Sequence, residues 1–122
     1  MKVYSFERLD VWIRAKDFVI KIYNISKEFP SEEKYGITSQ LRRAAISVPT
    51  NLAEGSGRRT NKDKAHFTQL AYSSLMEVLN LLIIAKELGY INNSDIQDLR
   101  TDLEEISKML SGLRNSQLNN QP

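Results

Sequence analysis

The sequence predicts an all-α protein, an antiparallel up-down-up-down four-helix bundle. Four segments repeat apolar residues at alternating spacings of three and four, which places those residues on one side of a helix. The connections between the segments are short, and no segment shows a convincing strand pattern. A chain of 122 residues holds four such helices but not a second domain. We therefore expect one bundle domain over residues 6–114 and a frayed polar tail over residues 115–122.

The first helix is expected from about Leu9 to Glu28. Its apolar stripe consists of Val11, Ala15, Phe18, Ile22, Ile25 and Phe29. Phe29-Pro30 ends it because the residue before a proline is disfavoured in the helical region. Residues 31–36 have the composition of a single helical turn, and the second helix is expected to begin near Thr38.

The second helix carries mostly small residues on its apolar side, which predicts that a neighbouring helix packs closely against it. The stripe consists of Leu41, Ala44, Ala45, Val48, Leu52 and Gly55. A separate polar face consists of Arg43, Ser47, Thr50, Asn51, Glu54 and Arg58. Pro49 removes one hydrogen bond to the carbonyl of Ala45, so we expect a bend there.

The third helix is expected to begin at a capping box formed by Thr60 and Asp63 and to end at Gly89 in a left-handed conformation. Its main stripe consists of Phe67, Leu70, Ala71, Leu75, Val78, Leu82 and Ala85. A second stripe consists of Tyr72, Met76, Leu79 and Ile83. A helix that is apolar on two sides requires burial on two sides.

A Ser94-to-Gln97 capping box is expected to start the fourth helix. Its stripe alternates three and four without a miss and consists of Ile96, Leu99, Leu103, Ile106, Leu110 and Leu113.

The net charge of +2 hides an uneven distribution. Residues 42–64 carry six basic and two acidic side chains, whereas residues 94–105 carry one basic and five acidic ones. The absence of cysteine excludes disulfides and thiolate metal sites. The N-terminus lacks the apolar core of a secretory signal, and no run approaches the roughly eighteen apolar residues of a membrane span. These features predict a soluble cytoplasmic protein without a membrane partner.

Gly55-Ser56-Gly57 resembles part of a nucleotide-binding loop, but its context favours helix-ending glycines. No strand precedes the segment, position 60 is Thr60 rather than a third glycine, and no Gly-Lys-Ser/Thr follows. Asn51 and Glu54 could form a catalytic pair, but a hydrogen bond or salt bridge at a helix contact is the preferred interpretation. His66 is the single histidine and is expected to be a solvated side chain. We predict no catalytic, cofactor or metal site.

Six basic residues are the candidate nucleic-acid contacts, because clustered guanidinium groups and helix N-termini both attract phosphate. They are Arg42, Arg43, Arg58, Arg59, Lys62 and Lys64. The corner from Arg58 to Lys64 is the preferred location. The alternative is that these arginines pair with Glu54 or with acidic residues of the fourth helix, and the sequence leaves both open.

A set of motifs spread over residues 6–113 resembles the bacterial four helix bundle proteins, also called 23S ribosomal RNA intervening-sequence proteins. These motifs are Leu9-x-Val11-Trp12-x-x-Ala15, Phe29-Pro30, Glu33, Tyr35-Gly36-Ile37, Ser39-Gln40-Leu41-Arg42-Arg43-Ala44-Ala45, Ser47-Val48-Pro49-x-Asn51-x-Ala53-Glu54-Gly55, Gly57-Arg58, Ala71, Ser74-Leu75, Glu77 and Gly89-Tyr90. Leu79-Asn80 departs from the more acidic run that many members have there. The resemblance implies a four-helix bundle that assembles as a homopentameric ring, and it brings no catalytic residues.

Two functions are weighed on this basis. The first is a non-enzymatic, oligomeric scaffold that binds structured RNA, in which a ring repeats each subunit's basic corner. The alternative is a protein-protein interaction scaffold without nucleic-acid binding, in which the polar face of the second helix or the acidic face of the fourth binds another protein. An enzyme is the least favoured class, since only carboxylates, lysines, hydroxyls and one histidine are available for chemistry.

Overall fold

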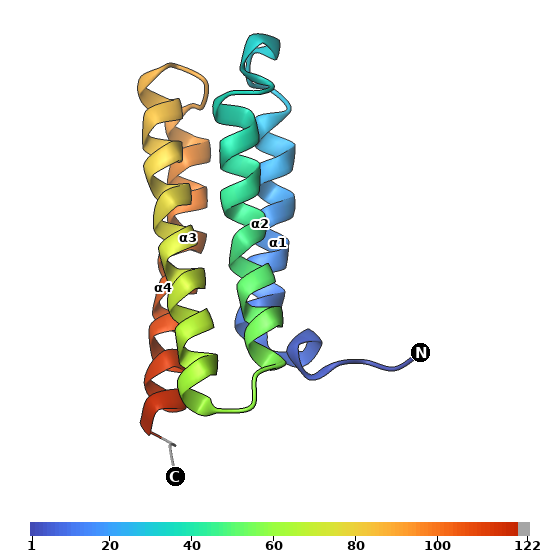
Figure 1. Ribbon diagram of the computed structural model, residues 1–122. Helices are drawn as coiled ribbons and strands as arrows, with labels where there is room; N and C mark the ends of the chain where they lie inside the picture. The colour runs from blue at the N-terminus through green and yellow to red at the C-terminus, as the bar shows by residue number, and fades with distance from the viewer. Residues whose placement is uncertain (120–122) are drawn as a thin grey trace.

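The computed structural model describes residues 1–119, and its helices run alternately up and down (Figure 1). The four long helices are α1 (Asp10–Ser26), α2 (Ile37–Ser56), α3 (Asn61–Glu87) and α4 (Asn93–Asn119). Two short 3-10 helices, η1 (Ser5–Arg8) and η2 (Ser31–Glu33), precede α1 and α2. Residues 1–119 contain no strand. The predicted all-α class with four helices is confirmed.

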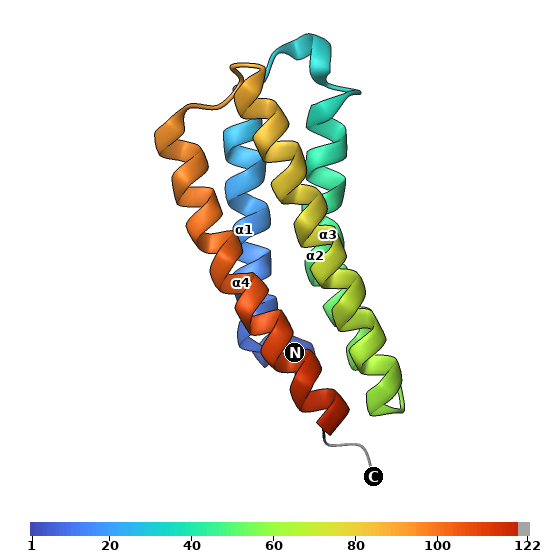
Figure 2. The same ribbon diagram turned by 90° about the vertical axis from the view of Figure 1, so that its left-hand side faces the viewer.

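The bundle has two layers, with α1 and α2 in one and α3 and α4 in the other (Figures 1 and 2). Each helix contacts the next along the chain, and α4 returns to contact α1, so the four enclose one core. Every helix contributes side chains with no exposed surface, among them Ile22, Leu41, Leu75, Leu82 and Leu99. Complete burial of such a side chain contributes roughly 1.5–3 kcal/mol. The stripes of alternating spacing therefore face the core as predicted, except at Leu70 of α3, which is 37% exposed.

The close approach predicted for α2 occurs at Gly55, which is buried against Phe67 of α3. A Cβ atom on Gly55 would lie 2.8 Å from the Cβ of Phe67, closer than real Cβ contacts allow. Leu41, Val48 and Leu52 are at most 4% exposed, so the apolar side of α2 faces inward. The helix continues through Pro49, and whether the proline bends it stays a prediction.

α1 ends at Ser26, slightly before the predicted Glu28, because the chain tightens there. The Glu28 and Phe29 backbone N–H groups bond to the carbonyls of Ile25 and Ser26, a short-range pattern that closes the last turn. Phe29 is buried, with its ring centroid 5.8 Å from that of Tyr90. The Tyr90 hydroxyl donates to Glu33 Oε2 at 2.9 Å, and this hydrogen bond raises the pKa of Tyr90. No sequence pattern predicted this link between the two upper loops.

The capping predictions have mixed outcomes. Thr60 caps α3 as predicted, since its Oγ1 accepts from the Asp63 backbone N–H at 3.1 Å. Gly89 has a φ of 80°, also as predicted. The cap predicted at Ser94 is wrong, because Asn92 Oδ1 accepts from the Asp95 N–H at 2.8 Å and α4 begins at Asn93. An earlier side chain with the same capping ability therefore starts the helix.

The frayed tail predicted after Arg114 is also corrected, because α4 continues to Asn119. Thr68 Oγ1 donates to Gln117 Oε1 at 2.8 Å, which ties the last turn of α4 to the first turns of α3. Residues 120–122 of the predicted tail lie outside the described residues.

The second apolar stripe of α3 packs partly within its own subunit. Tyr72, Met76 and Leu79 are partly buried against the core, while Ile83 remains exposed. Within residues 1–119, α3 is the one helix long and apolar enough to cross a membrane by length and composition, with a mean hydropathy of 1.4 over its most apolar window. One such helix is weak evidence for a span, because the core helix of a bundle has the same composition.

Candidate nucleic-acid interface

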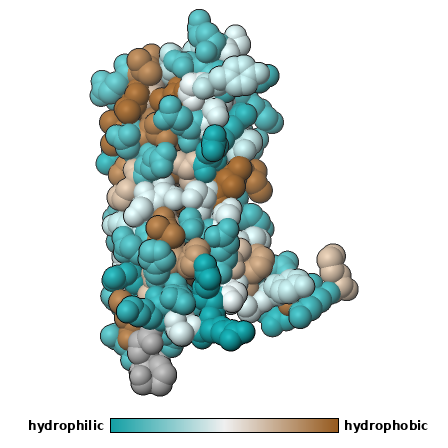
Figure 3. Space-filling model, viewed as in Figure 1, coloured by the Kyte–Doolittle hydropathy of each residue, from teal (hydrophilic) through white to brown (hydrophobic). Residues whose placement is uncertain are grey.

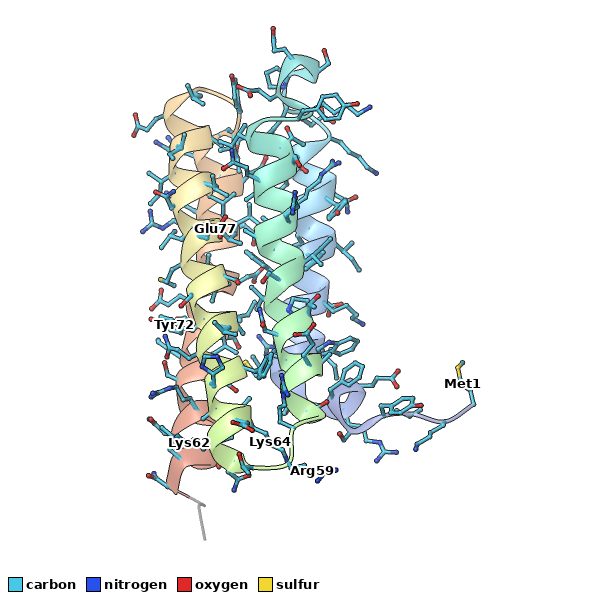
Figure 4. The ribbon with its side chains drawn as sticks, viewed as in Figure 1. Met1, Arg59, Lys62, Lys64, Tyr72 and Glu77 are labelled. Carbon is cyan, nitrogen blue, oxygen red and sulfur yellow. The ribbon has the colours of Figure 1, made fainter. Side chains whose placement is uncertain are left out.

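The connection between α2 and α3 brings four cationic residues to one end of the bundle. α2 ends at Ser56, and Gly57 follows with φ −85° and ψ −2°, so the chain leaves the helix without a left-handed residue. Arg58 and Arg59 form the loop before the Thr60 cap. Lys62 and Lys64 then lie in the first turn of α3. Lys64 lies on the same side of the helix as Arg59, and Lys62 lies on the other side (Figure 4). We call Arg58, Arg59, Lys62 and Lys64 the basic corner.

The first residue of the basic corner is held in place by an aromatic ring. The guanidinium carbon of Arg58 lies 4.6 Å from the ring centroid of Phe67, a cation–π contact. Because Gly55 lets Phe67 approach α2 closely, the ring lies directly beside the loop. Arg58 therefore packs against the Phe67 ring and still remains exposed to solvent.

The charges of the basic corner are not neutralised within the described residues. None of its four side chains forms an ion pair in residues 1–119. Arg58, Arg59 and Lys62 are exposed, and Lys64 is half-buried. The alternative of pairing with Glu54 or α4 therefore does not occur in this structure.

The acidic residues of α4 instead pair with α1. Lys21 Nζ lies 2.6 Å from Asp102 Oδ2 and 3.2 Å from Asp98 Oδ2, and Arg14 pairs with Glu105. These hydrogen bonds to the two aspartates raise the pKa of Lys21. The acidic segment is thus partly neutralised by its neighbour, whereas the basic corner is not.

Arg42 and Arg43 lie far from the basic corner, at the other end of α2. Arg42 and Arg58 are separated by about 24 Å of helix. Arg42 donates from Nε to Ser26 Oγ at 2.8 Å and from its terminal nitrogen to the Tyr23 carbonyl at 3.3 Å, with its guanidinium 4.5 Å from the Tyr23 ring centroid. Arg42 therefore joins α2 to the last turn of α1. Arg43 is exposed and lies next to Arg42, away from the basic corner.

The comparisons with known proteins agree with this architecture. The sequence model of the 23S rRNA-intervening sequence protein family matches residues 7–112, which is most of the chain. The chain belongs to this family. Among curated proteins, none matches it.

One solved structure has the same fold as this chain. It is a protein of unknown function from the S23 ribosomal protein family of Bacteroides thetaiotaomicron. The two share 22% identity with a TM-score of 0.79, over 85% of this chain and 97% of that one. At this identity the likeness shows the fold alone.

Two further motifs of the sequence, the Asn51/Glu54 pair and Gly55-Ser56-Gly57, have structural roles. The Asn51 side-chain nitrogen donates to the Ser47 carbonyl at 2.9 Å and to Ser47 Oγ at 3.0 Å, and Ser47 Oγ lies 2.8 Å from Ser74 Oγ on α3. Asn51 thus supports the α2–α3 contact through Ser47 and does not bond to Glu54. Gly55-Ser56-Gly57 ends α2 ahead of a capped helix, which confirms the plainer of its two interpretations.

Nothing in the described residues of this family member points to catalysis or a cofactor. His66 is exposed, with its ring 5.8 Å from that of Phe67. Residues 1–119 contain no group of three or more His, Cys, Asp or Glu side chains able to hold a metal ion.

Arg114 of α4 is a basic residue that no sequence pattern singled out. It is half-buried beside Thr68 and Tyr72, and its Nε is buried without a hydrogen-bond partner among the described residues. It comes from the C-terminal part of α4, which ends at the same end of the bundle as the basic corner (Figure 1). The apolar pattern of α4 could not have revealed the buried, unpartnered nitrogen of Arg114, because such a pattern carries no information about hydrogen-bond partners.

Proposed function

We propose that this protein is a non-enzymatic cytoplasmic scaffold that binds structured RNA through the basic corner and assembles as a homopentamer. The observation that carries the proposal is the basic corner itself, four cations with no ion-pair partner within residues 1–119. Membership of a family described by 23S rRNA intervening sequences supports RNA as the polyanion. Arg42 is left out of the interface because its donors already bond to α1.

The proposed RNA binding is electrostatic, and the contributions of the individual phosphate contacts add together. Each cation that neutralises a phosphate releases condensed counterions, so the logarithm of the affinity falls by about 0.7–0.9 per contact for each tenfold rise in salt. Contacts from one corner are weak on their own. A ring that repeats the corner on every subunit makes several contacts to one RNA at a high effective concentration.

The test is RNA binding measured against salt for matched charge variants. Replacement of Arg59 and Lys62 by Ala removes two exposed cations that form no ion pair within residues 1–119. Replacement of Lys27 and Lys34 by Ala removes the same charge from the opposite end of the bundle and serves as the control. We expect the Arg59/Lys62 variant to bind more weakly and to lose about 1.5 from the salt slope of each bound subunit.

Three results would contradict the proposal. They are the absence of binding at low salt with the assembly intact, affinity independent of salt, and equal losses in the two double variants. The first of these would favour a protein-binding scaffold without nucleic-acid contact. The observation that favours this second candidate is an exposed apolar groove between α1 and α2. Crosslinking in cells followed by sequencing of attached RNA separates the two candidates directly.

A further inference from the structure

An apolar groove runs along the outer face of the α1–α2 layer. Its volume is about 430 Å³. The apolar residues that line it are Phe6, Trp12, Val19, Ile20, Ile46, Pro49 and Ala53. Apolar side chains form a patch on this side of the surface at about mid-height (Figure 3). Contiguous apolar surface of this kind commonly marks a contact with another molecule.

The two ends of the groove differ in how well they are covered. At one end the ring of Phe6 in η1 packs edge-on against Trp12, with centroids 5.2 Å apart. At the other end Ile20 is 54% exposed and Ile46 is 41% exposed, although they lie on neighbouring helices. Nothing in residues 1–119 covers this second end.

The N-terminal arm, Met1–Tyr4, is a segment of this chain that lacks a packing partner. It projects away from the bundle on the same side as the groove, and Met1 lies far from every helix (Figures 1 and 4). Val3 is 47% exposed and Tyr4 is 56% exposed. The arm thus presents apolar side chains that its own subunit does not bury.

The direction of the arm is fixed at its base. The Tyr4 N–H donates to Glu7 Oε2 at 2.7 Å, and the Glu7 N–H donates to the Tyr4 carbonyl at 3.0 Å. Ile20 lies about 12 Å along α1 beyond Trp12, whereas the arm leaves sideways from the base of the bundle (Figure 1). In this structure the arm therefore leaves the uncovered end of its own groove unoccupied.

We propose that the uncovered end of the groove binds the N-terminal arm of a second copy of this chain. Val3 and Tyr4 supply apolar surface for Ile20 and Ile46. Two charged residues line the groove, and Lys16 already pairs with Asp17 at 3.6 Å. Glu54 has no ion-pair partner among the described residues and Lys2 of the arm has none either, so these two can pair. The proposal rests on the self-association put forward above and identifies a surface that joins the copies; it does not depend on RNA binding.

The chain's lack of cysteine makes disulfide trapping a direct test. Val3→Cys and Ile46→Cys are made as separate full-length proteins of different tag size, mixed and oxidised. We expect a disulfide-linked species that contains one chain of each kind. The matched control mixes Val3→Cys with Leu70→Cys, since Leu70 of α3 is 37% exposed, close to the exposure of Ile46, and lies in neither exposed apolar patch. At least tenfold less cross-linked product is expected in the control.

A charge reversal tests the same contact without cysteine chemistry. Lys2→Glu is expected to raise the dissociation constant of the assembly severalfold, measured by analytical ultracentrifugation. Lys2→Glu combined with Glu54→Lys is expected to restore it. Because both residues are exposed, neither change should alter helicity, which circular dichroism checks.

The outcomes separate this inference from the proposed function. An assembly of unchanged mass that gives no selective cross-link and no charge rescue overturns the arm contact alone. A monomeric chain with no cross-link at any concentration overturns both the arm contact and the proposed self-association. Equal cross-linking to Ile46→Cys and Leu70→Cys means random collision and overturns the arm contact.

Discussion

Gly55 is where α2 and α3 come closest, so its side chain decides how well they pack. We predict that Gly55→Ala lowers the free energy of unfolding by about 1–3 kcal/mol, because the added methyl group meets Phe67 at 2.8 Å. Gly112 of α4 is exposed, and a methyl group added there would meet no atom within 4 Å, so Gly112→Ala should raise stability by about 0.5–1 kcal/mol. Urea denaturation of both variants checks the pair. Equal effects would mean that helix propensity, and not the close approach, governs Gly55.

Two adjacent arginines on α2 should differ sharply in their contribution to stability. Arg42→Ala removes two hydrogen bonds and a stacked ring contact between α1 and α2, and we expect it to cost about 1–2 kcal/mol. Arg43→Ala at an exposed position should change stability by less than about 0.5 kcal/mol. Thermal unfolding of the two variants measures the difference. A similar melting temperature for both would contradict the structural role given to Arg42.

Sequence patterns could not separate these two arginines. Periodicity places Arg42 near the edge of the apolar stripe, but its bonds to Ser26 and Tyr23 depend on how α2 is rotated against α1. The position of the basic corner at one end of the bundle was predictable, because its four residues lie in or next to one short loop, but its contact with nucleic acid stays a prediction. Contacts between neighbours along the chain can be derived from the sequence, whereas those across a helix interface require the packed structure.

At the scale of the helices, ion pairs between Lys21 of α1 and two aspartates of α4 join the two helices, and their contribution to folding stability depends on pH. The hydrogen bonds to Asp102 and Asp98 raise the pKa of Lys21 above its usual 10.5 in the folded protein. Its stabilising contribution is therefore complete below pH 10.5 and is lost as the pH rises through the higher folded value. Because the side chain is 45% exposed, that contribution should be below about 1 kcal/mol.

The corresponding measurement compares Lys21→Met with the wild type across alkaline pH. We expect the variant to be less stable near neutral pH and the difference to shrink above pH 10.5. Lys27→Met is the control, since Lys27 is exposed and forms no ion pair within the described residues. A difference that stays constant with pH would assign the effect to lost packing by the lysine stem.

The helix ends show which boundaries can be predicted from the local sequence and which cannot. Thr60 was correctly predicted as a cap because one candidate side chain precedes α3 at the right spacing. At α4, Asn92 and Ser94 both have capping side chains, and local pattern does not rank them. The last turn of α4 is held by Gln117, whose partner Thr68 lies on another helix. An isolated polar segment of that composition would fray, so only the tertiary contact reveals the helix.

For the whole molecule, apolar surface lies on two different sides of the bundle. The groove faces outward from α1 and α2, while Ile83 and Ile84 near the end of α3 and Leu88 directly after it are exposed. Figure 3 shows apolar patches on both sides. Two unlike patches favour a head-to-tail contact, which closes into a ring when the rotation between subunits allows it and otherwise forms an open filament. A ring is the closed form that the proposed pentamer requires.

This geometry makes a prediction about mass and concentration. A closed ring should reach five times the chain mass of 14.0 kDa and then stay constant as concentration rises, because no binding site remains unfilled. We expect Ile84→Glu with Leu88→Glu to shift light-scattering masses toward the monomer, since burial of two charges in an apolar contact is costly. Gln97→Glu with Ser111→Glu adds the same charge at exposed positions of α4 and should leave the mass unchanged. A mass that grows continuously with concentration would instead identify an open filament, and the basic corners would then lie along a fibre and not around a closed ring.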